Sequence, residues 1–153
     1  MIELDGQNLK YGMSMADIEK LVTSLIGPSE MSYPLESIYV IECDSNPGYS
    51  VERFFRASTR RNPPDWIGEI TDDPLYIGSS SDTVKRIHEH ISAEGAMFTK
   101  FFPPKRLVEI RKHSKISLNR SNYRRENQRK EKLVANEYRS KTSKYVSTGG
   151  EQY

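Results

Sequence analysis

Two short apolar runs, each carrying a tyrosine, constrain the fold of this 153-residue chain most strongly. They are Ser37-Ile38-Tyr39-Val40-Ile41 and Leu75-Tyr76-Ile77-Gly78. Short runs that are rich in β-branched and aromatic residues, with turn residues nearby, are typical of strands. If the two strands pair as antiparallel neighbours, their phenols come to the same end of one sheet. The sequence therefore predicts a sheet built around these two strands.

The N-terminal residues predict a helix over 14–26. Ser14 and Asp17 have the spacing of a capping box, and apolar side chains follow at helical intervals, namely Ile18, Leu21, Val22 and Leu25. Gly27-Pro28 ends the pattern. We expect residues 1–34 to form a helical extension whose apolar stripe packs on a domain formed by residues 35–153.

The segment between the two tyrosine strands is predicted to be an inserted hairpin spanning about 44–73. A dense turn signal at 44–48 precedes a stretch of β-rich composition at 49–58, and residues 66–70 are a second short strand candidate. The segment carries Arg53, Arg56, Arg60 and Arg61. These arginines either reach nucleic acid or keep an edge strand soluble, and the sequence leaves both interpretations open.

The rest of the chain continues the pattern of a small α/β arrangement. Residues 74–78 form the second tyrosine strand, and a helix over 82–93 follows, capped by Ser81 or Asp82. A third strand is predicted over 105–111 and a long basic helix over 121–140. The tail at 145–153 is predicted to be extended or turn-like.

Composition excludes several protein classes. At 35% hydrophobic and 29% charged residues, the composition is that of an ordinary soluble chain. No apolar stretch reaches the roughly 18 residues that span a bilayer, and the start lacks secretory features, so we expect an intracellular protein, cytoplasmic or in the host cell if viral. Cys43 is the only cysteine, which rules out an intrachain disulfide or a cysteine-based zinc site. We interpret it as a buried strand residue.

Charge is distributed unevenly along the chain. Residues 99–145 hold 15 lysines and arginines against 4 acidic residues, although the net charge is only +2. A solvated helix has no need for charges of nearly one sign, whereas a phosphate backbone attracts them. The basic segment therefore favours nucleic-acid binding, with these candidate contacts: Lys100, Lys105, Arg124, Arg125, Arg129 and Lys130.

Four side chains have the chemistry that phosphodiester hydrolysis needs. Glu131 can hold one Mg²⁺, because this ion keeps most of its waters and needs only one or two carboxylates. Arg86 can donate to a phosphate oxygen, and Tyr76 can orient the water or the phosphate. Tyr39 has an ordinary pKa near 10, so it is a base only where a cation lowers that value.

Each of these residues also has a structural interpretation. Strand tyrosines usually serve packing, an arginine on a helix is commonly a surface residue, and Glu131 is surrounded by basic neighbours with which it can pair. Glu126 and Glu137 compete with it as metal ligands on the same helix. His88 and His90 are two residues apart, so they point to different helix faces and cannot form a paired metal site.

The order and spacing of these residues resemble the GIY-YIG nuclease superfamily. The first motif appears as Ser37-Ile38-Tyr39 and the second, intact, as Tyr76-Ile77-Gly78. Arg86 follows eight residues after Gly78, and His90 follows four after Arg86. The segment from Gly95 to Ile110 and the closing segment, with Glu131, Tyr138, Tyr145 and Gly149-Gly150, extend the resemblance over roughly residues 36–153.

The resemblance implies a three-stranded antiparallel sheet flanked by helices and a single divalent cation, Mg²⁺ or Mn²⁺, on Glu131. It also implies catalytic roles: Tyr39 as general base, Tyr76 as positioning group, Arg86 on the scissile phosphate, and His90. We therefore expect an endonuclease acting on DNA, with RNA as an open alternative, as a monomer or homodimer. The rival is a catalytically silent nucleic-acid-binding protein that uses the same basic segment.

Three features depart from the family pattern. Ser37 replaces the first glycine of the first motif. The two tyrosines are 37 residues apart, so the insertion at 44–73 is particular to this chain or its subgroup. The asparagine that many members place after the metal-binding helix has no clear counterpart, because Asn136 lies inside the predicted helix.

Overall fold

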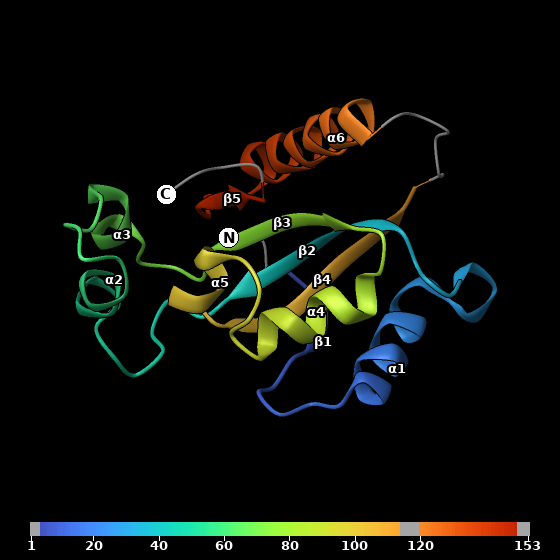
Figure 1. Ribbon diagram of the computed structural model, residues 1–153, viewed down its shortest axis with the longest axis horizontal. Coiled ribbons are helices and arrows are strands. Elements are labelled where there is room, and N and C mark those ends of the chain that lie inside the picture. The colour runs from blue at the N-terminus through green and yellow to red at the C-terminus, as the bar shows by residue number, and fades with distance from the viewer. Residues whose placement is uncertain (1–3, 114–119, 150–153) are drawn as a thin grey trace.

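A computed structural model of the chain describes residues 4–113 and 120–149 (Figure 1). Its sheet has the strand order β1-β4-β2-β3-β5, formed by Gln7–Asn8, Pro104–Lys112, Ser37–Cys43, Leu75–Ser80 and Val146–Thr148. β2 pairs antiparallel with both β3 and β4, as expected for the three predicted strands. The prediction of a three-stranded sheet is wrong, because β1 and β5 extend it to five. These two edge strands have two and three residues, too few for a recognisable alternation of polar and apolar residues.

Helices cover both faces of the sheet (Figure 1). On one face lie α1 (Met15–Ile26), α4 (Thr83–Ile91) and α5 (Met97–Phe101), and on the other lies α6 (Arg120–Lys141). Alternate residues of β2 enter two separate cores. Tyr39 and Ile41 join the core under α4 and α5, while Ile38 and Val40 join the core under α6. Every residue of β2 is therefore buried, which explains its continuous apolar sequence.

The N-terminal helix forms as predicted. The Ser14 hydroxyl accepts from the backbone N–H of Asp17 at 3.1 Å, and the Asp17 carboxylate accepts from the N–H of Ser14 at 3.3 Å. The helix ends at Gly27, whose φ of 89° favours glycine, and a short 3₁₀ turn, Pro28–Glu30, follows. Ile18 and Val22 are fully buried, and α1 packs on α4 and β4. The apolar stripe thus packs against the sheet side of the molecule, as expected.

The inserted segment is helical, so the predicted hairpin is wrong. Residues 49–58 largely form α2 (Val51–Thr59), and residues 66–70 largely form α3 (Asp65–Glu69). The Ser50 hydroxyl caps α2 by accepting from the N–H of Arg53 at 3.3 Å. In α2 only Phe55 is fully buried, so the helix packs through one side. The β-rich composition of the segment gave no indication of this helical pattern. The arginines of this segment therefore do not protect an edge strand.

The remaining predicted elements occur with small shifts of their ends. α4 is capped by Asp82, whose carboxylate accepts from the N–H of Lys85, and it ends at Ile91 rather than at residue 93. Cys43 is a buried free thiol. The predicted tail begins with β5, and its residues 150–153 lie outside the described part of the chain. None of the helices described is long and apolar enough to cross a membrane.

Candidate active site

Strand register brings the two tyrosines together on one sheet face. Tyr39 pairs with Gly78, and Ile41 pairs with Tyr76, so the two phenols are diagonal neighbours on β2 and β3. This arrangement confirms the antiparallel pairing expected from the sequence. Both side chains are almost fully buried beneath α4 and α5. A side chain on Gly78 would collide with the Tyr39 ring and hydroxyl, so the glycine is required for this close approach.

A chain of hydrogen bonds runs from Tyr39 into α5. The Tyr39 hydroxyl lies 2.7 Å from His90 Nε2, and His90 Nδ1 lies 2.9 Å from Thr99 Oγ1. The Thr99 hydroxyl donates to the Ala96 carbonyl at 2.9 Å, so its oxygen is left to accept from His90 Nδ1–H. In a neutral imidazole Nε2 is then the acceptor, and Tyr39 donates to it. The bonds thus define a single tautomer for neutral His90.

The pKa shifts of Tyr39 and His90 agree with both groups being neutral. Burial, and secondarily the positive charge of Arg86, lowers the pKa of His90 from 6.5 to about 3. Burial, followed by the nearby Tyr76 phenol, raises the pKa of Tyr39 well above its usual value. Arg86 acts on the Tyr39 pKa in the expected downward direction, but burial outweighs it. Tyr39 therefore rests as a protonated phenol.

Arg86 is the most accessible of the residues grouped around the phenols. It lies on α4, one turn before His90, and its side chain is 33% exposed. It lies 3.8 Å from Glu89 in a loose ion pair on the same helix. The guanidinium interacts with both tyrosines: burial alone would lower the Arg86 pKa, but the two phenols outweigh it and raise that pKa. A permanent positive charge beside the phenols is a suitable partner for a phosphate oxygen.

Glu131 reaches the site from the opposite face of the sheet. It is a buried residue of α6, and its Oε2 accepts from the Ser79 hydroxyl at 2.6 Å. A side chain on Gly149 would lie 3.0 Å from the Tyr76 hydroxyl and 3.1 Å from Glu131 Oε1. Gly149 therefore leaves space between the phenol and the carboxylate at the β3–β5 edge. The competing carboxylates are engaged elsewhere: Glu126 pairs with Arg129, and Glu137 pairs with Arg111.

This carboxylate fits a single hydrated cation. Within residues 4–113 and 120–149, no three His, Cys, Asp or Glu side chains are grouped as a metal site. Mg²⁺ does not require such a group, since it binds through one or two carboxylates and retains several waters. Glu131 supplies one carboxylate, and the space left by Gly149 adjoins its Oε1. The residues present are thus compatible with the cation that the resemblance implies.

Comparison with known proteins identifies the family. The family model of the GIY-YIG catalytic domain matches residues 66–145, slightly more than half of the chain. The chain belongs to the GIY-YIG family. A UPF0213 protein of Haloquadratum walsbyi is 38% identical over 45 residues, which cover 29% of this chain and 51% of that relative. The match thus spans about half of the relative's length. No solved structure matches the chain.

The family match begins only after the first tyrosine strand. Tyr76, Arg86, His90 and Glu131 lie inside the matched residues, whereas Tyr39 lies 27 positions before their start. In the structure, β2 nevertheless pairs along the whole of β3. The insertion therefore separates the two GIY-YIG strands in sequence but not in space. Membership of this family of nuclease domains favours a nuclease in general.

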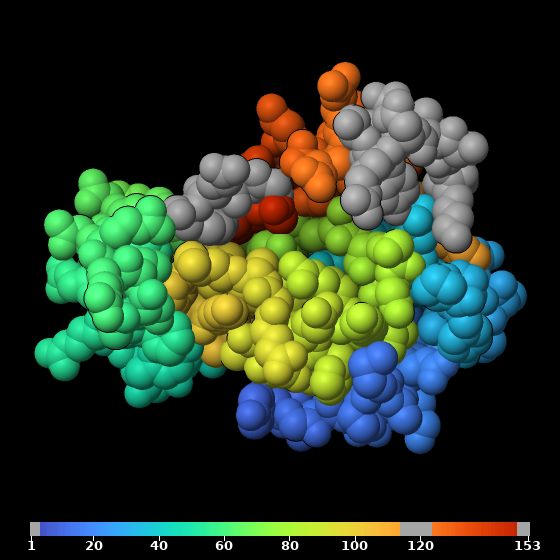
Figure 2. Space-filling view, viewed as in Figure 1, coloured from blue at the N-terminus to red at the C-terminus, as the bar shows by residue number. Residues whose placement is uncertain are grey.

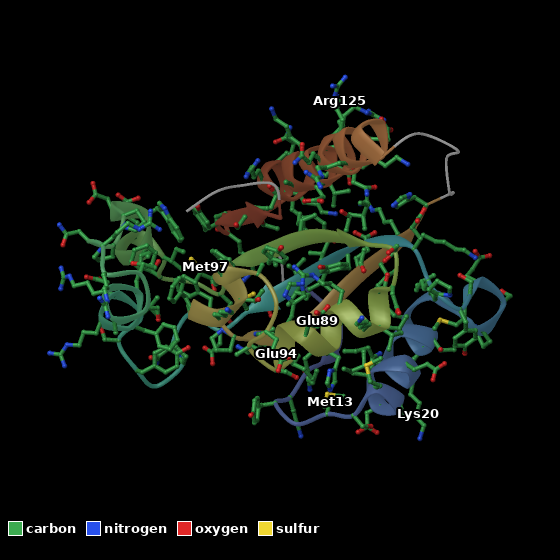
Figure 3. All side chains as sticks on the ribbon, viewed as in Figure 1. Met13, Lys20, Glu89, Glu94, Met97 and Arg125 are labelled. Atoms are coloured by element: carbon green, nitrogen blue, oxygen red, sulfur yellow. The ribbon has the colours of Figure 1, made fainter. Side chains whose placement is uncertain are left out.

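The basic residues predicted to contact nucleic acid differ in their surroundings. Arg124 and Arg125 are exposed on α6, and Arg125 points away from the sheet (Figure 3). Lys130 is half-buried on the same helix, and Lys100 is exposed on α5. By contrast, Arg129 lies 2.5 Å from Glu126, and Lys105 lies 2.6 Å from Asp73. Positions 114–119 of the basic segment lie outside the described residues.

Three supporting residues were missed from the sequence. Ser79 holds the Glu131 carboxylate, Thr99 fixes the tautomer of His90, and Gly149 leaves the space beside Tyr76. Ser79 follows directly after the Tyr76-Ile77-Gly78 motif, so its position next to the site was a usable signal. Thr99 carries no local signal, because its role depends on how α5 packs on α4. Gly149 was noted as part of the resemblance, without a function.

Proposed function

We propose that this protein is a divalent-cation-dependent endonuclease that hydrolyses phosphodiester bonds in DNA. The observation that carries the proposal is the presence of two hydrogen-bonded groups on the adjacent strands β2 and β3, Tyr39–His90 on one face and Ser79–Glu131 on the other, with Arg86 beside the phenols. In this proposal residues 35–153 form the nuclease domain, and residues 1–34 form an extension to it. Family membership supports the hydrolase class.

Arg86 and Tyr76 are assigned to the phosphate. The Arg86 guanidinium can neutralise charge that develops on a non-bridging oxygen as the water attacks. Burial keeps the pKa of Tyr76 above its usual value, so this phenol remains protonated and acts as a hydrogen-bond donor. A donor at this point can orient the phosphate or the attacking water. Neither residue has to change its protonation state.

Tyr39 and His90 are assigned to the proton. Tyr39 already donates to His90 Nε2, so it can take a proton from water only while its own proton moves to that nitrogen. His90 then carries the positive charge, while its Nδ1–H still donates to Thr99. The resulting hydroxide attacks phosphorus, the bond to the leaving oxygen breaks, and that oxygen takes a proton from solvent, while His90, with its low pKa, returns its proton to solvent. Tyr39 is thus a general base that acts through His90, rather than a resting phenolate.

Glu131 is assigned to the cation. When bound there, Mg²⁺ or Mn²⁺ supplies a Lewis acid for the phosphoryl oxygens and lowers the pKa of a bound water. Ser79 holds the Glu131 carboxylate by donating to Oε2, which leaves Oε1 facing the space beside Gly149. The role of Ser79 is therefore positioning.

A plasmid-cleavage assay tests the proposal. Purified wild-type protein with Mg²⁺ should nick or linearise plasmid DNA, and Glu131→Ala and Arg86→Ala should each reduce the rate at least about a hundredfold. The matched control is Glu126→Ala, which removes a carboxylate from the same helix that pairs with Arg129 instead of facing the site. It should retain near wild-type activity. If wild type cuts no nucleic acid faster than Glu131→Ala, the enzymatic proposal is wrong.

A gel-shift assay run beside the cleavage assay separates the enzyme from a silent binding protein. A binding protein that uses the basic segment would retain DNA in a gel-shift assay, with a steep salt dependence, and would show no Mg²⁺-dependent cleavage. The proximity of Tyr39 to Arg86 and Glu131 favours the enzyme, because binding alone does not require it.

A further inference from the structure

The inserted helix α2 has an exposed face formed by arginines. Arg53, Arg56 and Arg60 are three and four residues apart, a spacing that places them on one side of a helix. All three are exposed, while Phe55 points to the opposite side and is buried. Arg60 is the residue that caps the helix C-terminus. Together with exposed Arg61, these residues form what we call the α2 arginine face.

Ion pairing does not explain the exposure of Arg53, Arg56 and Arg60 on this face. In the part of the chain that the structure describes, no acidic side chain pairs with Arg53, Arg56 or Arg60. Other arginines of the protein do have acidic partners, as with Arg111, which pairs with both Glu109 and Glu137. Unbalanced arginines on one helix face are complementary to a row of phosphates.

The insertion is also anchored firmly to the core beside the candidate site. Phe54 and Phe55 of α2 both contact the Phe101 ring of α5, with ring centroids 5.2 and 5.1 Å apart. Trp66 of α3 stacks on Tyr145 with a centroid distance of 5.2 Å and an angle of 7°. Phe98 stacks between Trp66 and Tyr76, at 6.0 and 6.1 Å. A continuous set of aromatic contacts thus joins α3 to a candidate catalytic tyrosine.

The position of the α2–α3 insertion also suits a DNA contact. In Figures 1 and 2 the α2–α3 insertion forms one end of the molecule, next to α5. The basic helix α6 lies on the other face of the sheet. Because α2 packs on α5, and α5 packs on α4, which carries Arg86, a duplex bound at the candidate site and extending past α5 would reach the α2 arginine face. The α2 arginine face offers a second, rigidly held contact for that extension.

We infer that the α2 arginine face binds the phosphate backbone of duplex DNA outside the cleavage position. This inference rests on the proposed function, because it names a second contact for the same substrate. It assigns the insertion a role in placing the DNA, through contacts that carry no base sequence information. The residues that make the contact are Arg53, Arg56, Arg60 and Arg61.

The test compares two charge-matched double variants. One is Arg53→Gln/Arg56→Gln, and the control is Lys10→Gln/Lys20→Gln, which removes two exposed positive charges near and on α1. Lys20 points into solvent away from the insertion (Figure 3). Both changes are made in the Glu131→Gln background so that the DNA stays intact, and binding is measured by anisotropy of a labelled 30-base-pair duplex across a salt series.

We expect the arginine variant to bind about tenfold more weakly near 0.1 M salt, with a log–log salt slope shallower by about 1.8. The lysine control should match its parent. Trp66 is the only tryptophan, so its emission should change when duplex DNA saturates the parent protein. Equal affinity and slope in the two double variants, or unchanged Trp66 emission at saturation, would overturn the inference.

The same double variants are also made without the Glu131→Gln change, and their cleavage of plasmid DNA separates the two proposals. If wild type cuts plasmid DNA and the arginine variant binds like the control, only the role of the insertion is wrong. If wild type neither binds nor cuts DNA, the proposed function itself fails. A slower cleavage rate in the arginine variant at low DNA concentration, restored at high concentration, supports the inference, because binding rather than chemistry is then affected.

Discussion

The two faces of the sheet contribute opposite kinds of chemistry to the candidate site. Under α4 and α5, Tyr39, His90 and Thr99 form a buried chain of neutral groups linked by hydrogen bonds. On the α6 side, Ser79 holds the carboxylate of Glu131 within a strongly basic helix. In the proposed mechanism the first arrangement receives a proton, and the second holds the cation. One strand, β3, supplies both faces, with Tyr76 on one side and Ser79 on the other.

This difference shows how a small sheet can keep incompatible groups close together. A carboxylate placed beside a neutral imidazole would favour its protonation and raise its pKa. Burial, and secondarily the charge of Arg86, leaves His90 neutral, while on the other side the space at Gly149 adjoins both Glu131 Oε1 and the Tyr76 hydroxyl. Substitutions near Tyr39 and His90 should therefore differ from substitutions near Ser79 and Glu131 in their effects on stability and cleavage.

The largest effect should be a loss of folding stability at acid pH, caused by His90 in its hydrogen-bond chain with Tyr39 and Thr99. The folded pKa of His90 is about 3 and its ordinary value is 6.5, so the unfolded chain binds a proton that the folded one does not. Stability from this group is complete above pH 6.5 and is lost as the pH falls towards 3. At pH 4.5 the loss should be about 2–3 kcal/mol.

Urea denaturation of wild type and His90→Gln at pH 7 and pH 4.5 measures this loss. The stability advantage of wild type over the variant should shrink by that amount at the lower pH. His88→Gln, a partly exposed histidine on the same helix, is the matched control and should show a smaller change. An advantage that stays constant with pH would contradict a buried neutral His90.

The next effect concerns the glycine against which Tyr39 packs. In Gly78→Ala the new methyl group would lie 2.5 Å from the Tyr39 hydroxyl, with further close contacts to its ring. The phenol and His90 must then shift, which should cost about 1–3 kcal/mol of unfolding free energy and most of the cleavage activity. Gly68→Ala, within α3, meets only a side-chain oxygen at 3.3 Å and is the control. Thermal unfolding of both variants checks the difference.

The elements that carry the candidate side chains were more predictable from the sequence than the contacts between those side chains. Tyr76, Arg86 and Glu131 were identified because motif spacing and residue chemistry point to them directly. The elements that hold them, β3, α4 and α6, also had strong periodic or capping signals. The hydrogen-bond chain behind Tyr39 was not predictable, because Thr99 joins it only through the packing of α5 on α4. Local sequence does not report such tertiary contacts.

The wrong prediction for the insertion has a related cause. Val51, Phe54 and Phe55 raise the β propensity of the segment, yet their spacing of three and four residues fits a helix. Propensity is a weak guide when a segment packs through one side only. The short strands β1 and β5 were missed because two or three residues cannot show alternation, and their pairing depends on neighbours distant in sequence.

A smaller effect should follow from removing the hydrogen bond that orients the Glu131 carboxylate. Ser79→Ala removes the hydroxyl that donates to Glu131 Oε2 at 2.6 Å, so the carboxylate is less well oriented. We expect cleavage to fall about tenfold and the Mg²⁺ concentration for half-maximal rate to rise several-fold. Ser79→Thr keeps the hydroxyl and should restore much of the activity. Rates measured across a Mg²⁺ titration test this, and a lower rate with an unchanged Mg²⁺ requirement would count against a positioning role.

The smallest effect separates basic residues that look equivalent in sequence. Arg129 lies 2.5 Å from Glu126, whereas Arg125 is exposed and points away from the sheet (Figure 3). An arginine already paired with a carboxylate has less to offer a phosphate, since that pair must be broken first. Arg125→Gln should weaken duplex binding about two- to fivefold, and Arg129→Gln should change it less than about twofold. Anisotropy titrations at a fixed salt concentration measure both, and the reverse ranking would mean that the Arg129–Glu126 pair opens on DNA.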